Sequence, residues 1–357
     1  FCLIDSLMDQ NLVSKVRQGI EDLNRLGYPA TMVFLFDEAW ELARQSWNMF
    51  HSNTNSNDNE TRQQQDQNRF SFTYDVLAWC ISDQGFSPHR DRQPEDVKDS
   101  FTSAVRPSAD LWTHWVALSP ATPSTSCLYV IPKSQDPGYV EGDDDKDDGK
   151  DPLQRALPCK QAYGHIRALP RTTGQSVIFT HRILHWGSIR DTSLSRNSNE
   201  QQPEPLRVAI SFVRARDSFE RPYLAKASSS HFWELSHAQR LLLVCAQFLI
   251  YYQRLDLSNH VLRQCYNYCK EHEQELEETY RQKVFLEFCR AMKESLSQSN
   301  EAETTSGKDQ EQSGEVAVEA ASGDTDILGQ GLHGQRGKAA FGHPRQGGAD
   351  DALTQRL

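Results

Sequence analysis

His89-Arg90-Asp91 combines residue types and a spacing that suit a metal ion. Residues i and i+2 of an extended segment point to the same side, so this imidazole and carboxylate can occupy adjacent positions on one ion. The triplet follows an apolar run, Gly85 and Pro88, where its side chains would project from the end of a strand. Taken alone the signal is weak, because a chain with twelve histidines contains about one such triplet by chance. A solvated surface turn is the alternative.

A third ligand would complete a set of two histidines and one carboxylate, which leaves three positions on iron(II) for a chelating oxo-acid and dioxygen. His185 is our candidate, because it follows the apolar run Gly174–Thr180 and precedes Gly187-Ser188, near a strand end held by a turn. His181 competes with it, and its alternative role is a hydrogen-bonded core or rim histidine. If iron is bound, the second ring nitrogen of each ligand should donate to a carbonyl or carboxylate.

The segment Leu206–Arg214 predicts a strand that carries a buried arginine. Alternation places Arg207, Ala209, Ser211 and Val213 on one face and an apolar set with Arg214 on the other. A guanidinium beside small residues suits a planar carboxylate, and the Ser211 hydroxyl can add a donor. The alternative is an edge-strand arginine that pairs with a surface aspartate.

Four segments together resemble the phytanoyl-CoA dioxygenase (PhyH-like) family, a branch of the iron(II)/2-oxoglutarate-dependent oxygenases. They are HRD (89–91), WVALSPATPSTSCLYVIPKSQ (115–135), GQSVIFTHRILHWGS (174–188) and RVAISF (207–212). They occur in order with suitable gaps and span about residues 70–216, so the combination is far more specific than any single segment.

The resemblance implies a double-stranded β-helix, a jelly-roll or cupin-like barrel, with the metal in its mouth. It implies His89, Asp91 and the distal His185 as ligands, and Arg207 with Ser211 on the C5 carboxylate of 2-oxoglutarate. The implied reaction consumes dioxygen and 2-oxoglutarate, releases succinate and carbon dioxide, and hydroxylates a substrate.

Two segments depart from the family pattern. The segment that usually ends in Gly-Ser-His is Lys133-Ser134-Gln135, and the usual Gly-Asp turn is Gly174-Gln175. Both departures concern loop geometry and substrate rather than the proposed ligands. Thr113 shares a strand face with Trp115 and is a candidate polar contact for the co-substrate, although core packing is the commoner role for the aromatic residues there. Trp186 could pack the barrel rim or stack on substrate.

Short β-rich runs between residues 70 and 216 predict the central fold. Pro, Gly and acidic loops separate them, which favours an antiparallel sandwich or barrel over a doubly wound parallel sheet. The predicted strands are Ser71–Ile81, Leu111–Leu118, Cys127–Pro132, Ser176–Thr180 and Leu206–Arg214.

Helical periodicity on both sides of this core predicts a cover of helices at 11–50 and 236–296. The first helix should end at Gly27. Residues 51–69 and 297–357 are poor in apolar side chains, so we expect a flexible loop and a disordered tail. The predicted organisation is therefore one mainly β domain over 1–296, with flanking helices and its core at about 70–216, followed by the tail.

Composition restricts the partners. The 357 residues carry a formal net charge of −11, with acidic residues concentrated at 141–151, so nucleic acids and anionic membranes are disfavoured. The most apolar run, Leu241–Ile250, is half the length of a membrane span. We expect an intracellular protein and favour the cytoplasm. The ending Gln355-Arg356-Leu357 only distantly resembles a peroxisomal signal. Because the chain starts at Phe1 rather than Met, a preceding targeting segment stays open.

The eight cysteines form no C-x-x-C pair and no regular disulfide pattern, which favours free thiols. Cys265 and Cys269 would share a helix face, but two thiols without further His or Cys partners rarely make a zinc site.

Two rival functions stay open. A cupin-like module without turnover could bind a metabolite or a partner, and a zinc hydrolase could use the same three ligands. Succinate release with iron, oxygen and 2-oxoglutarate would separate both from the dioxygenase. No feature of the sequence selects between a small molecule and an acyl-thioester substrate, or gives the oligomeric state.

Overall fold

A five-stranded antiparallel sheet forms the larger part of the β region in the computed structural model, which describes residues 1–54, 70–81, 85–91, 110–141, 151–188, 206–217, 219–225 and 231–308. Its strand order is β1-β7-β4-β9-β2. The strands are β1 (Cys2–Ile4), β2 (Phe70–Ile81), β4 (Leu111–Ala117), β7 (Ser176–Thr180) and β9 (Arg207–Arg216). Because β9 lies between β4 and β2, its backbone is paired on both sides.

A four-stranded antiparallel sheet has the order β3-β8-β5-β6. Its strands are β3 (Phe86–His89), β5 (Leu128–Val130), β6 (Arg167–Leu169) and β8 (His185–Gly187). The sequence predicted only β5 of these, since runs of three or four residues are too short to display a clear alternation.

A hydrophobic cluster joins the two sheets. The larger sheet contributes side chains of β4, β7 and β9, and the smaller sheet contributes side chains of β5 and β6. They are Trp115, Ala117, Val177, Phe179 and Ala209 from the larger sheet, and Leu128, Val130 and Leu169 from the smaller. The prediction of antiparallel sheets in place of a doubly wound parallel sheet is therefore confirmed.

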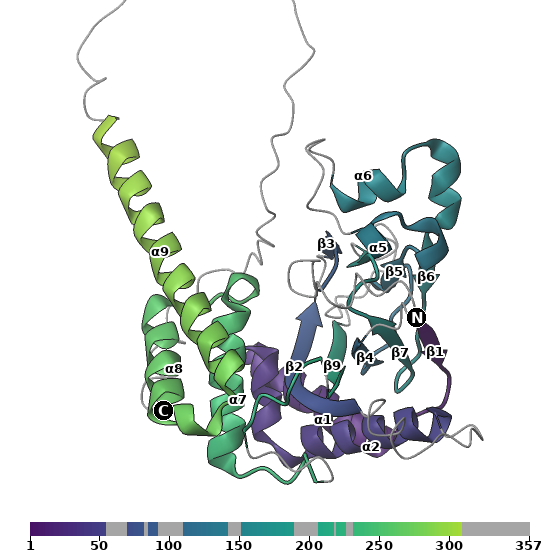
Figure 1. Cartoon of the computed structure of the whole chain (residues 1–357), viewed down its shortest axis with the longest axis horizontal. Helices are drawn as coiled ribbons and strands as arrows, with labels where there is room; N and C mark the ends of the chain where they lie inside the picture. The colour runs from purple at the N-terminus through teal and green to yellow at the C-terminus, as the bar shows by residue number, and fades with distance from the viewer. Residues whose placement is uncertain are drawn as a thin grey trace, which may run out of the picture.

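Helices cover the other face of the larger sheet. The long ones are α1 (Gln10–Arg25), α2 (Asp37–Thr54), α7 (His237–Ile250), α8 (Asn259–Glu271) and α9 (Glu278–Lys308). Their apolar side chains form one buried cluster with Val208, Ile210 and Phe212 of β9 and with residues of β2. In Figure 1, α1 and α2 lie below the strands and α7, α8 and α9 stand to the left. The predicted helical cover is confirmed.

Shorter helices lie in the connections. They are α5 (Gly138–Glu141) and α6 (Pro152–Ala156), and the 3-10 helices η1 (Ala30–Leu35), η3 (Lys133–Gln135), η4 (Lys160–His165), η6 (Tyr252–Arg254) and η7 (Glu273–Glu275).

Local signals explain where two of the long helices begin or end. Gly27, with a φ of 80°, directly follows the C-cap of α1, as predicted, because glycine adopts the left-handed conformation without steric cost. Ser236 begins α7 with a capping box, in which its side chain and that of Gln239 bond each other's backbone.

Two predicted boundaries differ from the structure. The helix α2 extends through Thr54, into the segment predicted as a flexible loop, and the rest of that segment lies outside the described residues. The predicted start of the tail at Ser297 falls inside α9, which continues to Lys308. Residues 309–357 lie outside the described residues.

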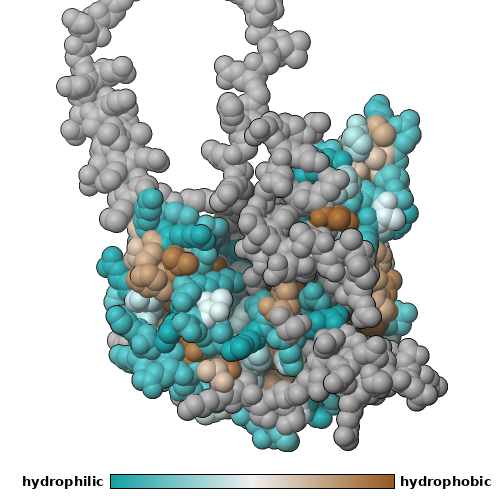
Figure 2. Space-filling model, in the orientation of Figure 1, coloured by the Kyte–Doolittle hydropathy of each residue, from teal (hydrophilic) through white to brown (hydrophobic). Residues whose placement is uncertain are grey.

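The coloured residues on the face shown in Figure 2 are mainly hydrophilic, with separate apolar patches. Among the described helices, none combines the length and the apolar character that crossing a membrane requires. All eight cysteines are free thiols, as predicted.

Candidate metal centre and buried arginine

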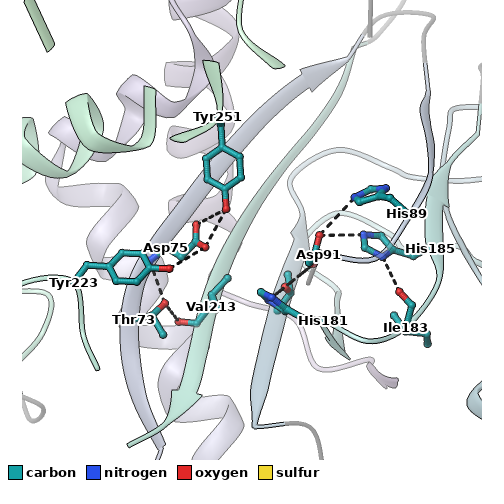
Figure 3. A network of polar contacts seen from close by, with 11 residues as sticks. Thr73, Asp75, His89, Asp91, His181, Ile183, His185, Val213, Tyr223 and Tyr251 are labelled. Atoms are coloured by element: carbon teal, nitrogen blue, oxygen red, sulfur yellow. Dashed lines mark hydrogen bonds and ion pairs between the residues drawn. The ribbon is translucent and has the colours of Figure 1, made fainter. Parts of the chain in front are cut away.

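His89, Asp91 and His185 come together in the fold, each offering one ligand atom within 4.8 Å of the other two. The Asp91 Oδ1 atom lies 3.5 Å from Nε2 of His89 and 3.7 Å from Nε2 of His185. Figure 3 shows both imidazoles facing this carboxylate. Among the described residues, this is the only group of three or more His, Cys, Asp or Glu side chains with such spacing.

The pairing of β3 with β8 positions the two histidines. His89 and His185 are direct partners in the register, and their ring centroids lie 4.4 Å apart. A β-carbon on Gly85 would lie 2.1 Å from the Gly187 carbonyl oxygen, so only glycine allows the two segments to approach so closely. Asp91 follows the end of β3, and the predicted convergence of the i and i+2 side chains is present.

Backbone carbonyls fix the tautomers of these two histidines. Nδ1 of His89 lies 2.8 Å from the Ser87 carbonyl oxygen, and Nδ1 of His185 lies 3.1 Å from the Ile183 carbonyl oxygen. A carbonyl oxygen can only accept, so each Nδ1 donates and each Nε2 keeps a lone pair that faces Asp91. These bonds match the prediction that the second ring nitrogen donates to a carbonyl.

The local electrostatics favour the protonation states that bind metal. Burial raises the pKa of Asp91, but the surrounding imidazoles, led by that of His185, outweigh burial and hold the pKa well below its ordinary value. Burial lowers the pKa of His185 to about 4. At neutral pH the carboxylate is therefore ionised and the His185 imidazole is neutral, as ligation requires.

The alternative ligand, His181, lies on the other side of the carboxylate. Its Nε2 atom is 3.9 Å from Asp91 Oδ2 and 2.8 Å from the Thr113 hydroxyl. It does not belong to the group of three. The Thr113 hydroxyl lies 3.4 Å from Asp91 Oδ2, and its contact with a co-substrate stays a prediction.

Arg207 is buried on the inner face of β9, with 2% of its surface exposed. Its guanidinium carbon lies 5.6 Å from the Phe86 ring centroid and 5.9 Å from that of Trp115. None of its side-chain nitrogens has a hydrogen-bond partner among the described residues. Burial lowers the pKa of Arg207 to about 10, so the group stays charged at neutral pH.

The position of Arg207 excludes the surface alternative, because β9 is not an edge strand and the side chain is buried. Ser211, on the same face, lies 3.5 Å from the Leu77 carbonyl oxygen. Phe86 links this region to the metal-binding group, since its ring centroid lies 5.6 Å from that of His89 and 6.3 Å from that of His185.

Three residues that build this region were not predicted from the sequence. Phe86 lies between Arg207 and the two histidines. Arg90 and Asp136 form a buried ion pair next to the loop that carries His89 and Asp91. The position of Arg90 between two candidate ligands was the only available signal. Trp186 packs in parallel against Tyr129, with ring centroids 5.7 Å apart, which agrees with the rim-packing alternative.

Comparison with known proteins finds only a weak likeness to solved structures. No protein-family model matches the sequence, and neither does any curated protein. Solved structures that share a likeness include AviO1 from Streptomyces viridochromogenes Tue57, with 17% identity and a TM-score of 0.27 over 41% of this chain and 51% of that one. The chain thus spans about half the length of AviO1.

Two further solved structures contain 2-oxoglutarate, also called alpha ketoglutarate. SnoN, a non-heme alpha ketoglutarate dependent epimerase solved with Fe3+, alpha ketoglutarate and nogalamycin RO, is 13% identical over 60% of this chain and 77% of that one, with a TM-score of 0.33. EctD from S. alaskensis, solved with 2-oxoglutarate and 5-hydroxyectoine, is 18% identical over 42% and 44%, with a TM-score of 0.27. At such low scores these likenesses decide neither the fold nor the reaction of this chain.

Proposed function

We propose that this protein is an iron(II)- and 2-oxoglutarate-dependent dioxygenase of the phytanoyl-CoA dioxygenase type. The observation that carries the proposal is the convergence of His89, Asp91 and His185 in a fold that also buries a charged Arg207 without a hydrogen-bond partner among the described residues. The paired antiparallel sheets are compatible with the jelly-roll barrel of that family.

The donor set fits iron(II). Two neutral imidazole nitrogens and one carboxylate oxygen are the ligands of non-haem iron oxygenases, and they leave coordination positions for a chelating co-substrate. The backbone bonds at each Nδ1 hold the rings so that the Nε2 atoms converge. Bound iron(II) would supply the activation of dioxygen and the oxidative decarboxylation of 2-oxoglutarate to succinate and carbon dioxide.

Arg207 fits the far carboxylate of 2-oxoglutarate. A buried guanidinium has lost its water, and its partners within the fold are the faces of Phe86 and Trp115. A carboxylate can satisfy the guanidinium with two parallel charge-assisted bonds. Ser211 lies on the same face of β9 and can contribute a hydroxyl. Phe86 touches both the arginine and the histidines, so it would line the side of a co-substrate that connects them.

The proposed reaction is hydroxylation of a small molecule or an acyl thioester in an intracellular compartment. The carboxylate of Asp91 occupies the position that is open to halide in iron halogenases, which favours hydroxylation. A binding module without turnover and a zinc hydrolase are the alternatives that the experiment must separate.

Anaerobic titration of 2-oxoglutarate into the Fe(II)-loaded protein tests the site directly. We expect a metal-to-ligand charge-transfer absorbance when 2-oxoglutarate binds. After oxygen is admitted, we expect succinate to form, and a screen of metabolites should find one that stimulates its formation. If the protein binds 2-oxoglutarate but forms no succinate with any of the substrates tried, the binding module is favoured. Failure of the Fe(II)-loaded protein to bind 2-oxoglutarate would contradict the proposal.

A further inference from the structure

The two oxygens of Asp91 face different partners. Oδ1 lies between the Nε2 atoms of His89 and His185, where the candidate ligand atoms converge. Oδ2 lies on the opposite side, 3.4 Å from the hydroxyl of Thr113 and 3.9 Å from Nε2 of His181. The carboxylate is therefore divided between a metal-binding side and a protein-binding side (Figure 3).

The chemistry of these groups sets the direction of the hydrogen bonds. The ionised Asp91 carboxylate can only accept, so the Thr113 hydroxyl donates its proton to Oδ2. The same hydroxyl lies 2.8 Å from His181 Nε2 and has its lone pairs free to accept, so His181 donates through Nε2–H. This tautomer is opposite to that of His89 and His185. It leaves His181 Nε2 without the lone pair that a metal ligand needs.

We propose that Thr113 and His181 are positioning residues that hold Asp91 with Oδ1 toward the metal, and that His181 is not itself a ligand. The inference rests on the proposed metal site and extends it. Thr113 belongs to β4 and His181 follows β7, and these neighbouring strands of the larger sheet pair at Thr113 and Phe179. Both side chains are buried, so the sheet presents a fixed pair of donors to a carboxylate held in the loop after β3.

This arrangement explains why three histidines surround one carboxylate. Two of them have backbone acceptors at Nδ1 and face Oδ1, and the third reaches Oδ2 with a threonine hydroxyl between. Residues that orient a metal ligand typically contribute 10- to 100-fold to metal affinity, about as expected for a hydrogen bond to a charged group.

The test is anaerobic Fe(II) or Mn(II) titration of the full chain against a chromogenic chelator. Thr113→Val, which keeps the shape and removes the hydroxyl, should raise the metal dissociation constant about 10- to 100-fold. Thr113→Ser should restore affinity to within about threefold, since it keeps the donor. Thr180→Val is the matched control, because the Thr180 hydroxyl contacts Tyr139 and not Asp91, and it should leave affinity unchanged.

His181 provides the second arm. His181→Leu should weaken metal binding by a similar factor, and combining it with Thr113→Val should add little, because the two residues act as a unit. Saturating metal should still give one bound ion per chain in both single variants. If Thr113→Val does not fold, as judged by circular dichroism, His181→Leu against wild type decides the question.

Folded variants that bind metal with wild-type affinity would overturn the inference and leave the proposed function in place. A separate measurement distinguishes failure of this inference from failure of the proposed function. If the wild-type protein binds Fe(II) no more tightly than Asp91→Ala, the metal centre itself fails, and the proposed function fails with it.

Discussion

Arg90 and Asp136 form a bidentate ion pair in which neither side chain is exposed to solvent. The two nitrogen–oxygen distances are 2.7 and 2.8 Å, and Nη1 of Arg90 also donates to the Arg182 carbonyl oxygen. Arg90 stands between His89 and Asp91, so the pair ties the metal-binding loop to the turn that follows η3. Two contacts therefore fix this loop, the buried Arg90–Asp136 ion pair and the pairing of β3 with β8.

Removing one partner of this pair should destabilise the fold strongly. Asp136→Ala leaves a buried guanidinium without its carboxylate, and we expect a loss of about 3 to 5 kcal/mol in the free energy of unfolding. Urea denaturation measures this loss. Asp22→Ala, which breaks the exposed pair with Arg25, is the control and should change the free energy of unfolding far less, because water screens the exposed pair. Equal effects of the two substitutions would show that the buried pair does not stabilise the loop.

Substitution of the proposed ligands should separate His185 from His181. Asp91→Ala and His185→Ala should remove most of the iron, because two remaining ligands chelate poorly. His181→Ala should keep a stoichiometry of about one ion per chain at saturating metal, with weakened affinity. Metal analysis after gel filtration gives the stoichiometry, and a titration gives the affinity. Loss of iron in His181→Ala together with retention in His185→Ala would reverse the assignment.

Substitution of Arg207 should affect 2-oxoglutarate and spare the metal. A buried bidentate charge pair loses about 3 to 5 kcal/mol when one partner is removed, and each 1.4 kcal/mol is about tenfold in affinity. Arg207→Ala should therefore raise the dissociation constant for 2-oxoglutarate at least about a hundredfold. Arg207→Lys should recover only part of this, because an ammonium keeps the charge and loses the planar fork. Wild-type affinity for 2-oxoglutarate in Arg207→Ala, measured by absorbance titration, would remove the support for an oxo-acid site.

The stability of the protein should fall on mild acidification because of His114. This imidazole lies between Ser46 and Ser176, with Arg214 3.4 Å away, and burial followed by the charge of Arg214 lowers its pKa well below the ordinary 6.5. The unfolded chain therefore binds a proton below about pH 6.5 that the folded chain does not. The contribution of the neutral His114 ring to the free energy of unfolding is complete above about pH 6.5. It is lost as the pH falls toward the pKa of His114 in the folded protein, at no more than about 1.4 kcal/mol per pH unit.

Urea denaturation of the wild type and of His114→Asn between about pH 5 and 6.5 measures this contribution. The wild type should lose stability faster than the variant over this range, since the variant lacks the titrating ring. Parallel pH profiles for the two proteins would mean that His114 takes up its proton within the folded state.

Sequence patterns of short range were sufficient for several features of this protein. The alternation along β9 assigned Arg207 and Ser211 to one face, because side chains of a strand point alternately to either side whatever surrounds the strand. The long helices also followed from the periodicity of their apolar residues, and the end of the first one followed from Gly27. The i and i+2 spacing of His89 and Asp91 predicted that these side chains converge.

The tertiary structure decided what depends on distant segments. Both His181 and His185 follow the same apolar strand, and only the pairing of β3 with β8 brings His185 opposite His89. The partner of Arg90 and the position of Thr113 behind Asp91 likewise join residues far apart in the chain. Local propensity constrains the direction of each side chain along its own strand or helix, whereas a site built from several segments depends on strand register and sheet packing, which no short stretch of sequence specifies.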